Sequence, residues 1–246
     1  MKFIKQYLLC AFIFASLISL AQEIKTELVY KVRASSMPDK KPPVLIMLHG
    51  YGSNESDLFE LSKTVESKYL IFSIRAPYKG KEIGYAWYDL EFLPNKQLSY
   101  NYKQVENSRA KIMSFISHAC KAYKADSTKV YLLGYSQGTI MAYDLALKLP
   151  KKISGVVALS GKMLPETMKY SGKSETIQKQ HYFIGHGYSD NVIDIKEAES
   201  SKKYLDSLKV KDVTFNRYEM PHAIMSAELL DFKSWLSKQL KPKEKK

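Results

Sequence analysis

Short runs of apolar residues constrain the fold of this chain more than any other feature. VLIML at 44–48 and VYLLG at 130–134 are apolar throughout rather than alternately polar and apolar. Such runs fit strands in the middle of a parallel sheet, where helices cover both faces. The run at 26–33 alternates more and is expected to form an outer strand. Further runs with strand character lie at 69–74, 153–159, 181–185 and 213–218.

Helical patterns separate these runs. Residues 102–123 place apolar side chains at helical spacing, and 138–149, 194–208 and 225–240 behave likewise. Strand and helix signals therefore alternate from residue 44 onward, which predicts an α/β fold: a mostly parallel central sheet with helices on both faces. The segment 78–101 is rich in Gly, Tyr and Trp and is predicted to be an insertion that lies over a site.

The N-terminal residues have the pattern of a secretory signal. Lys2 and Lys5 precede an apolar run at 7–20, and Ala21 supplies a small residue at the expected cleavage point. The run is shorter than a membrane-spanning helix requires. We therefore expect residues 1–21 to be cleaved, the protein to be secreted or periplasmic, and no stable membrane insertion after cleavage.

The cysteines and the length of the chain limit what the mature protein can contain. A lipid anchor at Cys10 is the less favoured alternative, because a large side chain precedes this cysteine and the apolar stretch before it is short. Cleavage after residue 21 leaves Cys120 as the only cysteine, so no disulfide within the chain is expected. The remaining length fits one domain at 22–240, followed by a lysine-rich tail at 241–246.

The charge of the chain is strongly basic. The full sequence has 38 basic and 25 acidic residues, and removal of Lys2 and Lys5 leaves a net charge of +11. Such an excess of positive charge can favour binding to nucleic acids or anionic surfaces. The lysines are scattered, however, and no helix-turn-helix, zinc or aromatic-basic RNA motif accompanies them. A solvated basic surface is the preferred interpretation, and no nucleic-acid partner is expected.

The pentapeptide GYSQG at 134–138 follows one of the apolar runs and leads directly into a helical pattern. This is the strand-to-helix context of a nucleophile elbow, which would present the Ser136 hydroxyl at the carboxyl end of the sheet. Glycine is needed at 134 and 138, where a side chain would collide with neighbouring elements. The alternative is a chance match in which Ser136 only caps the helix.

A serine nucleophile needs a base and an acid that orients the base. In the α/β-hydrolase order both follow the serine, and His222 lies in the loop after the last predicted strand. Asp190 lies in the loop after the strand at 181–185, whereas Asp194 is expected to cap the next helix. The second GYS, at 187–189, therefore matters for the aspartate that follows it and not for its own serine.

Two backbone N–H groups are expected to form an oxyanion hole. One belongs to Gln137, the residue after the nucleophile, and the other to Tyr51, in the glycine-bearing turn after the first apolar run. His49 precedes Ser136 in the chain, whereas the catalytic base of an α/β-hydrolase follows the serine. We expect it to brace the turn.

Taken together, these residues resemble the phospholipase/carboxylesterase family of α/β-hydrolases, which includes bacterial carboxylesterases and acyl-protein thioesterases. The matching segments occur in the family's order and are LHGYGSNESDL, RAP, AWYDL, GYSQGTIMAYDLAL, LSG, GHGYSDNVI and MPHAI. The resemblance implies the triad Ser136, Asp190 and His222 and the oxyanion residues Tyr51 and Gln137. It also implies that the AWYDL region borders the substrate pocket.

Trp87 and Tyr88 are accordingly candidate pocket residues, although Trp87 could equally pack in the core. The sequence predicts an exported serine carboxylesterase of the EC 3.1.1 type, which acts on a small-molecule, lipid-linked or polysaccharide-linked ester and requires no metal or cofactor. Two alternatives stay open. One is a peptidase or acyltransferase that uses the same triad, and the other is a non-catalytic, hydrolase-like binding module.

Overall fold

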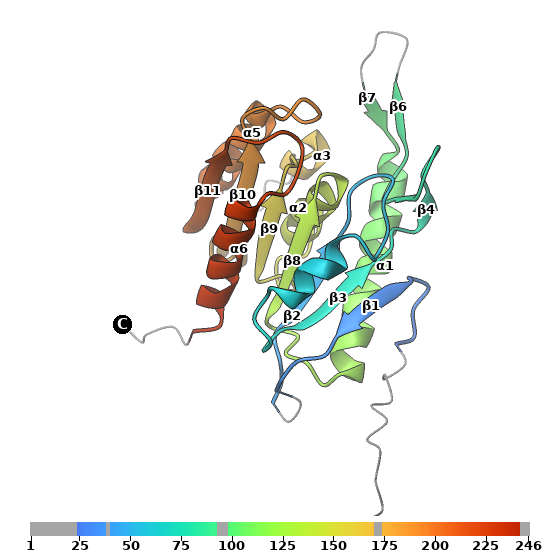
Figure 1. Cartoon of the computed structure of the whole chain (residues 1–246), viewed down its shortest axis with the longest axis vertical. Coiled ribbons are helices and arrows are strands. Elements are labelled where there is room, and N and C mark those ends of the chain that lie inside the picture. The colour runs from blue at the N-terminus through green and yellow to red at the C-terminus, as the bar shows by residue number, and fades with distance from the viewer. Residues whose placement is uncertain (1–23, 38–39, 93–97, 170–173, 242–246) are drawn as a thin grey trace, which may run out of the picture.

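The apolar runs form the strands of a seven-stranded sheet with the order β1-β3-β2-β8-β9-β10-β11 (Figure 1). The computed structural model describes residues 24–37, 40–92, 98–169 and 174–241. The predicted signal peptide and nearly all of the lysine-rich tail lie outside these residues. The strands of the sheet are β1 (Tyr30–Arg33), β2 (Val44–Leu48), β3 (Leu70–Ile74), β8 (Val130–Tyr135), β9 (Gly155–Leu159), β10 (His181–Gly187) and β11 (Asp212–Tyr218).

Strand direction in this sheet agrees with the sequence prediction. β1 lies at one edge and pairs with β3 in the antiparallel direction, whereas every other pair in the sheet is parallel. β2 is fully buried, and its side chains alternate between two apolar clusters. Ile46 belongs to the cluster on one face, and its neighbours Leu45 and Met47 belong to the cluster on the other, as the two-residue period of a strand requires. Both faces of the sheet are therefore covered.

Four of the helices match the predicted segments to within one residue at each end. They are α1 (Tyr102–Ala122), α2 (Gln137–Lys148), α5 (Ile195–Ser207) and α6 (Ser226–Gln239). Three shorter elements were not predicted: the 3-10 helix η1 (Leu58–Lys63), α3 (Pro165–Met168) and α4 (Glu175–Gln178). Each has only four to six residues, which is too short for a helical period to be visible in the sequence.

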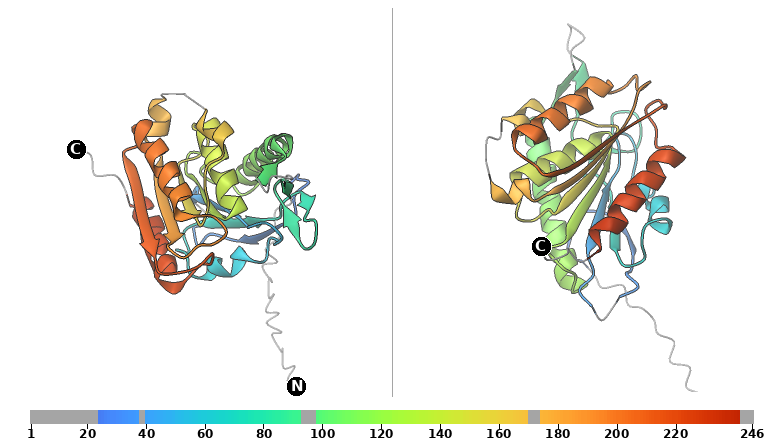
Figure 2. Two further views of the ribbon diagram at one scale, coloured as in Figure 1. Left: turned by 90° about the horizontal axis from the view of Figure 1, so that it is seen from above. Right: turned by 90° about the vertical axis from the view of Figure 1, so that its left-hand side faces the viewer.

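The helices divide between the faces of the sheet (Figure 2). Apolar side chains of α1, α2 and α5 belong to the cluster on one face, and those of η1 and α6 belong to the cluster on the other. This arrangement is an α/β-hydrolase fold. Within the described part of the chain, none of the helices is long and apolar enough to cross a membrane.

The segment 78–101 forms two small hairpins beside the main sheet. The first pairs β4 (Tyr78–Lys79) with β5 (Tyr85–Ala86), and the second pairs β6 (Leu90–Phe92) with β7 (Leu98–Tyr100). Asn101 then caps α1, because its side chain accepts a hydrogen bond from the backbone N–H of Gln104.

Candidate active site

Ser136 occupies the sharp turn between β8 and α2. Its backbone has φ 53° and ψ −115°, a conformation that costs a residue with a side chain about 1–3 kcal/mol. The turn is held in place because Ser136 N donates to Leu159 O at 3.0 Å and Thr139 Oγ1 donates to the same oxygen at 2.7 Å. The Ser136 hydroxyl makes no capping hydrogen bond to α2. The interpretation of Ser136 as a simple helix cap is therefore wrong.

The two glycines of GYSQG permit this turn. A Cβ atom at Gly138 would lie 1.9 Å from Leu48 O on the neighbouring strand β2, and one at Gly134 would lie 2.4 Å from Thr139 N. Both neighbours are backbone atoms that cannot move aside without displacing β2 or α2. The close approach of strand and helix at the elbow thus requires glycine at both positions.

His222 and Asp190 meet although 32 residues separate them in the chain. His222 Nδ1 lies 2.7 Å from Asp190 Oδ2, a charge-assisted hydrogen bond between the loops that follow β11 and β10. The His222 main chain is fixed as well, because the Tyr135 hydroxyl donates to His222 O at 2.9 Å. The rings of Tyr135 and His222 also pack together, with centroids 5.2 Å apart.

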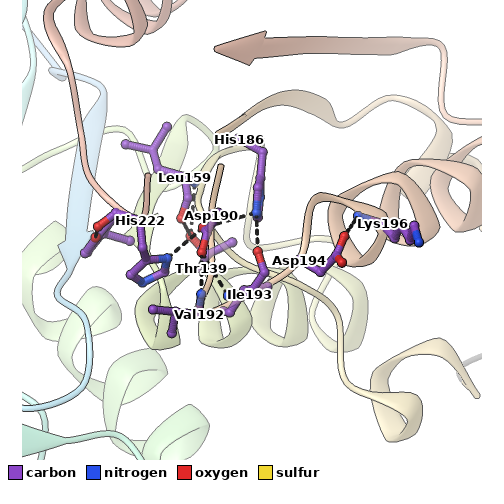
Figure 3. A network of polar contacts seen from close by, with 10 residues as sticks. Thr139, Leu159, His186, Asp190, Val192, Ile193, Asp194, Lys196 and His222 are labelled. Carbon is purple, nitrogen blue, oxygen red and sulfur yellow. Dashed lines mark hydrogen bonds and ion pairs between the residues drawn. The ribbon is translucent and has the colours of Figure 1, made fainter. Parts of the chain in front are cut away.

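Asp190 is tied down through both carboxylate oxygens (Figure 3). Its Oδ1 accepts hydrogen bonds from Val192 N and Ile193 N, each at 2.9 Å, while Oδ2 faces His222. Burial of the side chain opposes ionisation, but the bonds from His222 and the two backbone N–H groups outweigh burial and lower the pKa of Asp190. Asp190 is therefore held as a carboxylate.

A second histidine, His186, lies on the other side of Asp190 (Figure 3). Its Nε2 is 2.7 Å from Ile193 O and 3.3 Å from Asp190 Oδ2, and its side chain is fully buried. Because a carbonyl oxygen only accepts, Nε2 carries the proton and donates it. His186 thus fixes the loop that carries Asp190. Sequence reasoning assigned His186 no role, although its position four residues before Asp190 was a usable signal.

The neighbouring polar residues of this loop have other roles. Asp194 caps α5 as expected, because its side chain accepts from Lys196 N at 2.9 Å. Ser189, the serine of the second GYS, is exposed and does not line the cavity at Ser136.

Tyr51, Ser136 and Gln137 line one cavity. Gln137 opens α2, so its backbone N–H belongs to the first helical turn, where N–H groups have no partner within the helix. Its side chain is buried and holds the segment that follows β5: Trp87 N donates to Oε1 at 2.8 Å, and Nε2 donates to Tyr88 O at 2.7 Å. Gln137 therefore links the elbow to the 78–101 segment.

His49 braces the turn that carries Tyr51. Its Nε2 accepts a hydrogen bond from Ala76 N at 3.0 Å, which leaves Nδ1 as the protonated nitrogen that donates to Gly50 O at 2.7 Å. Burial lowers the pKa of His49 and keeps the ring neutral in this arrangement. Its backbone oxygen accepts from the Trp87 indole N–H at 2.8 Å. His49 is thus a structural residue of the site.

The two candidate pocket residues, Trp87 and Tyr88, have different positions in the structure. Trp87 is fully buried, packs in the apolar cluster beneath the site and does not line the cavity. Tyr88 does line it, together with Leu90 and Tyr100 from the hairpin β6–β7. The 78–101 segment therefore borders the site through Tyr88 and the second hairpin, whereas Trp87 supports the site from the core.

The cavity at Ser136 has a volume of about 630 Å³, a size typical of small-molecule sites. His222 and Ser136 both line it, and among the described residues no hydrogen bond joins the two side chains. Such bonds are often long before a substrate binds. The remaining wall is mixed: Ile140, Leu164 and Val192 are apolar, while Lys162 and Glu197 form an ion pair at 3.1 Å. Sequence reasoning assigned none of these wall residues.

These groups can support acyl transfer. A serine on a strained turn, an imidazole held by a buried carboxylate, and the first residue of α2 all line one cavity. The described residues contain no group of three or more His, Cys, Asp or Glu side chains placed to hold a metal ion.

A family model and individual relatives both match most of the chain. The model of the family described as Phospholipase/Carboxylesterase matches residues 31–240. Acyl-protein thioesterase 1 of Yarrowia lipolytica is 23% identical over 209 residues, which cover 80% of this chain and 92% of that protein. Acyl-protein thioesterase 1 of Saccharomyces cerevisiae is 28% identical over 232 residues, covering 85% of this chain and 97% of that protein.

Solved structures share the fold. The carboxylesterase of Bacillus cereus superposes with a TM-score of 0.72 at 21% identity and covers 87% of this chain and 95% of its own. Acyl-protein thioesterase 2 of Zea mays superposes with a TM-score of 0.70 at 19% identity, over 87% and 99% of the two chains.

Proposed function

Because the chain belongs to the phospholipase/carboxylesterase family, we propose that it is an exported serine hydrolase that cleaves carboxylic esters through Ser136, His222 and Asp190. One observation carries the proposal: His222 is held by a buried carboxylate at 2.7 Å and lines the same cavity as the strained Ser136. The same cavity is therefore lined by a serine that makes no capping hydrogen bond to α2 and by an imidazole whose Nδ1 is fixed by a carboxylate, the pair that nucleophilic catalysis requires.

In the proposed reaction, Ser136 Oγ attacks the ester carbonyl while His222 accepts its proton. Asp190 keeps the Nδ1–H tautomer of His222 and stabilises the imidazolium that forms. The backbone N–H groups of Gln137 and Tyr51 stabilise the oxyanion of the tetrahedral intermediate. His222 then protonates the leaving alcohol, and a water molecule activated by His222 releases the acid from the acyl-enzyme.

The cavity supports an ester of moderate size. Its apolar wall suits an acyl chain or an aromatic ring, and its tyrosines and charged residues suit a polar alcohol portion. Thioesters belong among the substrates to be tested, because relatives in the comparison carry the name acyl-protein thioesterase.

A panel of p-nitrophenyl esters of graded acyl length, with matched thioesters and peptide anilides, tests the reaction class. We expect hydrolysis of esters and little cleavage of anilides. Preference for the anilides would favour a peptidase, and absence of any turnover by the folded protein would favour a non-catalytic binding module.

Export is tested separately, because residues 1–21 lie outside the described part of the structure. N-terminal sequencing of the protein recovered from the producing cells is expected to begin at Gln22. A mature protein that still begins at Met1 would contradict export by a cleaved signal. Neither result bears on the chemistry at Ser136.

A further inference from the structure

A second large cavity, of about 680 Å³, lies where the parallel strands begin, at the opposite end of these strands from Ser136. Its lining includes Pro43, Lys129, Ser154 and His181, which stand immediately before or at the start of β2, β8, β9 and β10. The candidate active site instead follows the carboxyl ends of these parallel strands. The two cavities are therefore separated by the length of the sheet.

The charge of this second cavity is unusual. Seven lysines line it, and none of its described lining residues is acidic. They come from several segments far apart in the chain: Lys41, Lys68, Lys129, Lys151, Lys179, Lys238 and Lys241. A concave surface of one charge sign concentrates the electrostatic potential that attracts an anion.

Two of the seven lysines pair with an acidic residue. Lys129 lies 3.7 Å from Asp126, and Lys179 lies 3.5 Å from Glu175. The side chains of the other five form no ion pair with any acidic residue that the structure describes. All seven lysines are exposed, so their charges are accessible to an anion that enters the cavity.

Tyr131 contributes a polar group to the wall of the cavity. Tyr131 lines the cavity and is only 5% exposed, yet its hydroxyl has no hydrogen-bond partner among the described residues. Its ring packs edge-on against Tyr69 and Trp235, which fixes the direction of the hydroxyl. The hydroxyl can exchange hydrogen bonds with a bound anion or sugar.

We propose that this cavity, the lysine cavity, binds a segment of an anionic polysaccharide. Lysine ammonium groups are flexible point charges and suit several separated anionic groups better than one planar group that requires a bidentate fork. Between them, Tyr131, Thr176 and Gln239 offer hydroxyl and amide groups that can exchange hydrogen bonds with sugar hydroxyls. A flexible single polymer chain can follow a concave surface more closely than a flat bilayer or a rigid double helix can.

Dextran sulfate, with neutral dextran as the uncharged control, is a suitable probe for the purified protein at low salt. The cavity variant Lys41→Gln/Lys68→Gln/Lys151→Gln is compared with Lys103→Gln/Lys121→Gln/Lys203→Gln, which removes the same charge from exposed positions outside the cavity. We expect the cavity variant to bind about tenfold or more weakly and with a smaller salt dependence, and the control variant to change by less than about threefold.

Tyr131→Phe gives a second, uncharged test. It removes only the unpartnered hydroxyl, so we expect weaker binding of dextran sulfate with an unchanged unfolding temperature. Hydrolysis of a small soluble ester should be unaffected in all of these variants, which separates this site from the proposed catalysis.

Equal losses in the two triple variants would show that overall charge alone drives binding and would overturn the assignment. Unchanged binding of dextran sulfate by the cavity variant would overturn it as well. The assignment would also be overturned if vesicles containing phosphatidylglycerol or duplex DNA bound more tightly than dextran sulfate and the cavity variant abolished that binding.

Discussion

His222 Nδ1 lies 2.7 Å from Oδ2 of Asp190, a carboxylate with no exposed side-chain surface. The other oxygen of Asp190 is already occupied by the N–H groups of Val192 and Ile193. The protein therefore determines which carboxylate oxygen faces the imidazole. This geometry predicts the effect of replacing the acid by its amide.

In Asp190→Asn, the amide oxygen should keep the two backbone bonds and turn the NH₂ group toward His222. His222 Nδ1 would then have to accept a hydrogen bond, which places the imidazole proton on Nε2 and prevents the ring from acting as a base. We expect kcat for ester hydrolysis to fall by roughly 10³- to 10⁴-fold with an intact fold. Asp206→Asn, an exposed position on α5, is the matched control. Equal activity of both variants would contradict the role of Asp190.

His186 should act as a positioning residue for Asp190. His186→Phe removes the N–H group that donates to Ile193 O and lies 3.3 Å from Asp190, so the loop that carries Asp190 loses a buried bond. We expect kcat to fall by about 10-fold or more with little change in KM, because the bond positions the triad and does not touch substrate. His186→Asn, which keeps an N–H donor, should recover part of the loss. A role in packing alone would predict that Phe is tolerated better than Asn.

Gln137 links the elbow to the substrate side of the site. In Gln137→Leu, the buried Trp87 N–H and Tyr88 C=O lose their partners, while the backbone N–H of residue 137 remains. Two unsatisfied buried groups should lower the free energy of unfolding by about 2–4 kcal/mol. KM should rise because Tyr88 forms part of the cavity wall. Chemical denaturation and steady-state kinetics measure the two effects, and unchanged stability would show that water replaces the side chain.

Glu228 makes stability depend on pH. It is fully buried on α6, and neither carboxyl oxygen has a hydrogen-bond partner in the described structure. Burial, with a further contribution from Asp231, raises the pKa of Glu228 from 4.5 to about 8. The folded protein therefore holds a proton that the unfolded chain releases above its lower pKa. The resulting stability is fully present below about pH 4.5 and is lost as the pH rises through about 8.

The loss between these two pKa values amounts to about 5 kcal/mol. Glu228→Gln removes the titrating group, so the difference in unfolding free energy between variant and wild type should grow in favour of the variant from pH 5 to pH 8.5. Denaturant unfolding at several pH values measures it. A difference that does not change with pH would show that Glu228 is not protonated in the folded protein.

Much of the fold could be predicted because its signals are local. The run VLIML became a fully buried strand, and the long helical patterns became α1, α2, α5 and α6. The elbow could be located because strand, Gly-Tyr-Ser-Gln-Gly and helix are contiguous in the sequence. The chain order of α/β-hydrolases then selected Asp190 and His222 from the later loops, and the structure brings these two side chains within hydrogen-bond distance.

The remaining features depend on contacts between distant segments. The hydrogen bonds of Gln137 to residues 87 and 88 span about fifty positions, and no local pattern encodes them. The position of Trp87 in the core, and not at the cavity wall, follows from its bond to His49 O. The lysine cavity was hidden for the same reason: its lysines appear scattered along the chain and converge only where the parallel strands begin.

The central claim is that Ser136 is the nucleophile, and covalent labelling tests it most directly. A fluorophosphonate probe should label the wild-type protein at one site, identified by mass spectrometry of the labelled peptide as Ser136, and ester hydrolysis should stop in step with labelling. Ser136→Ala should fold normally, resist the probe and lose roughly 10⁴-fold or more in kcat. Labelling at another residue, or a folded Ser136→Ala protein that still hydrolyses esters at the wild-type rate, would contradict the mechanism.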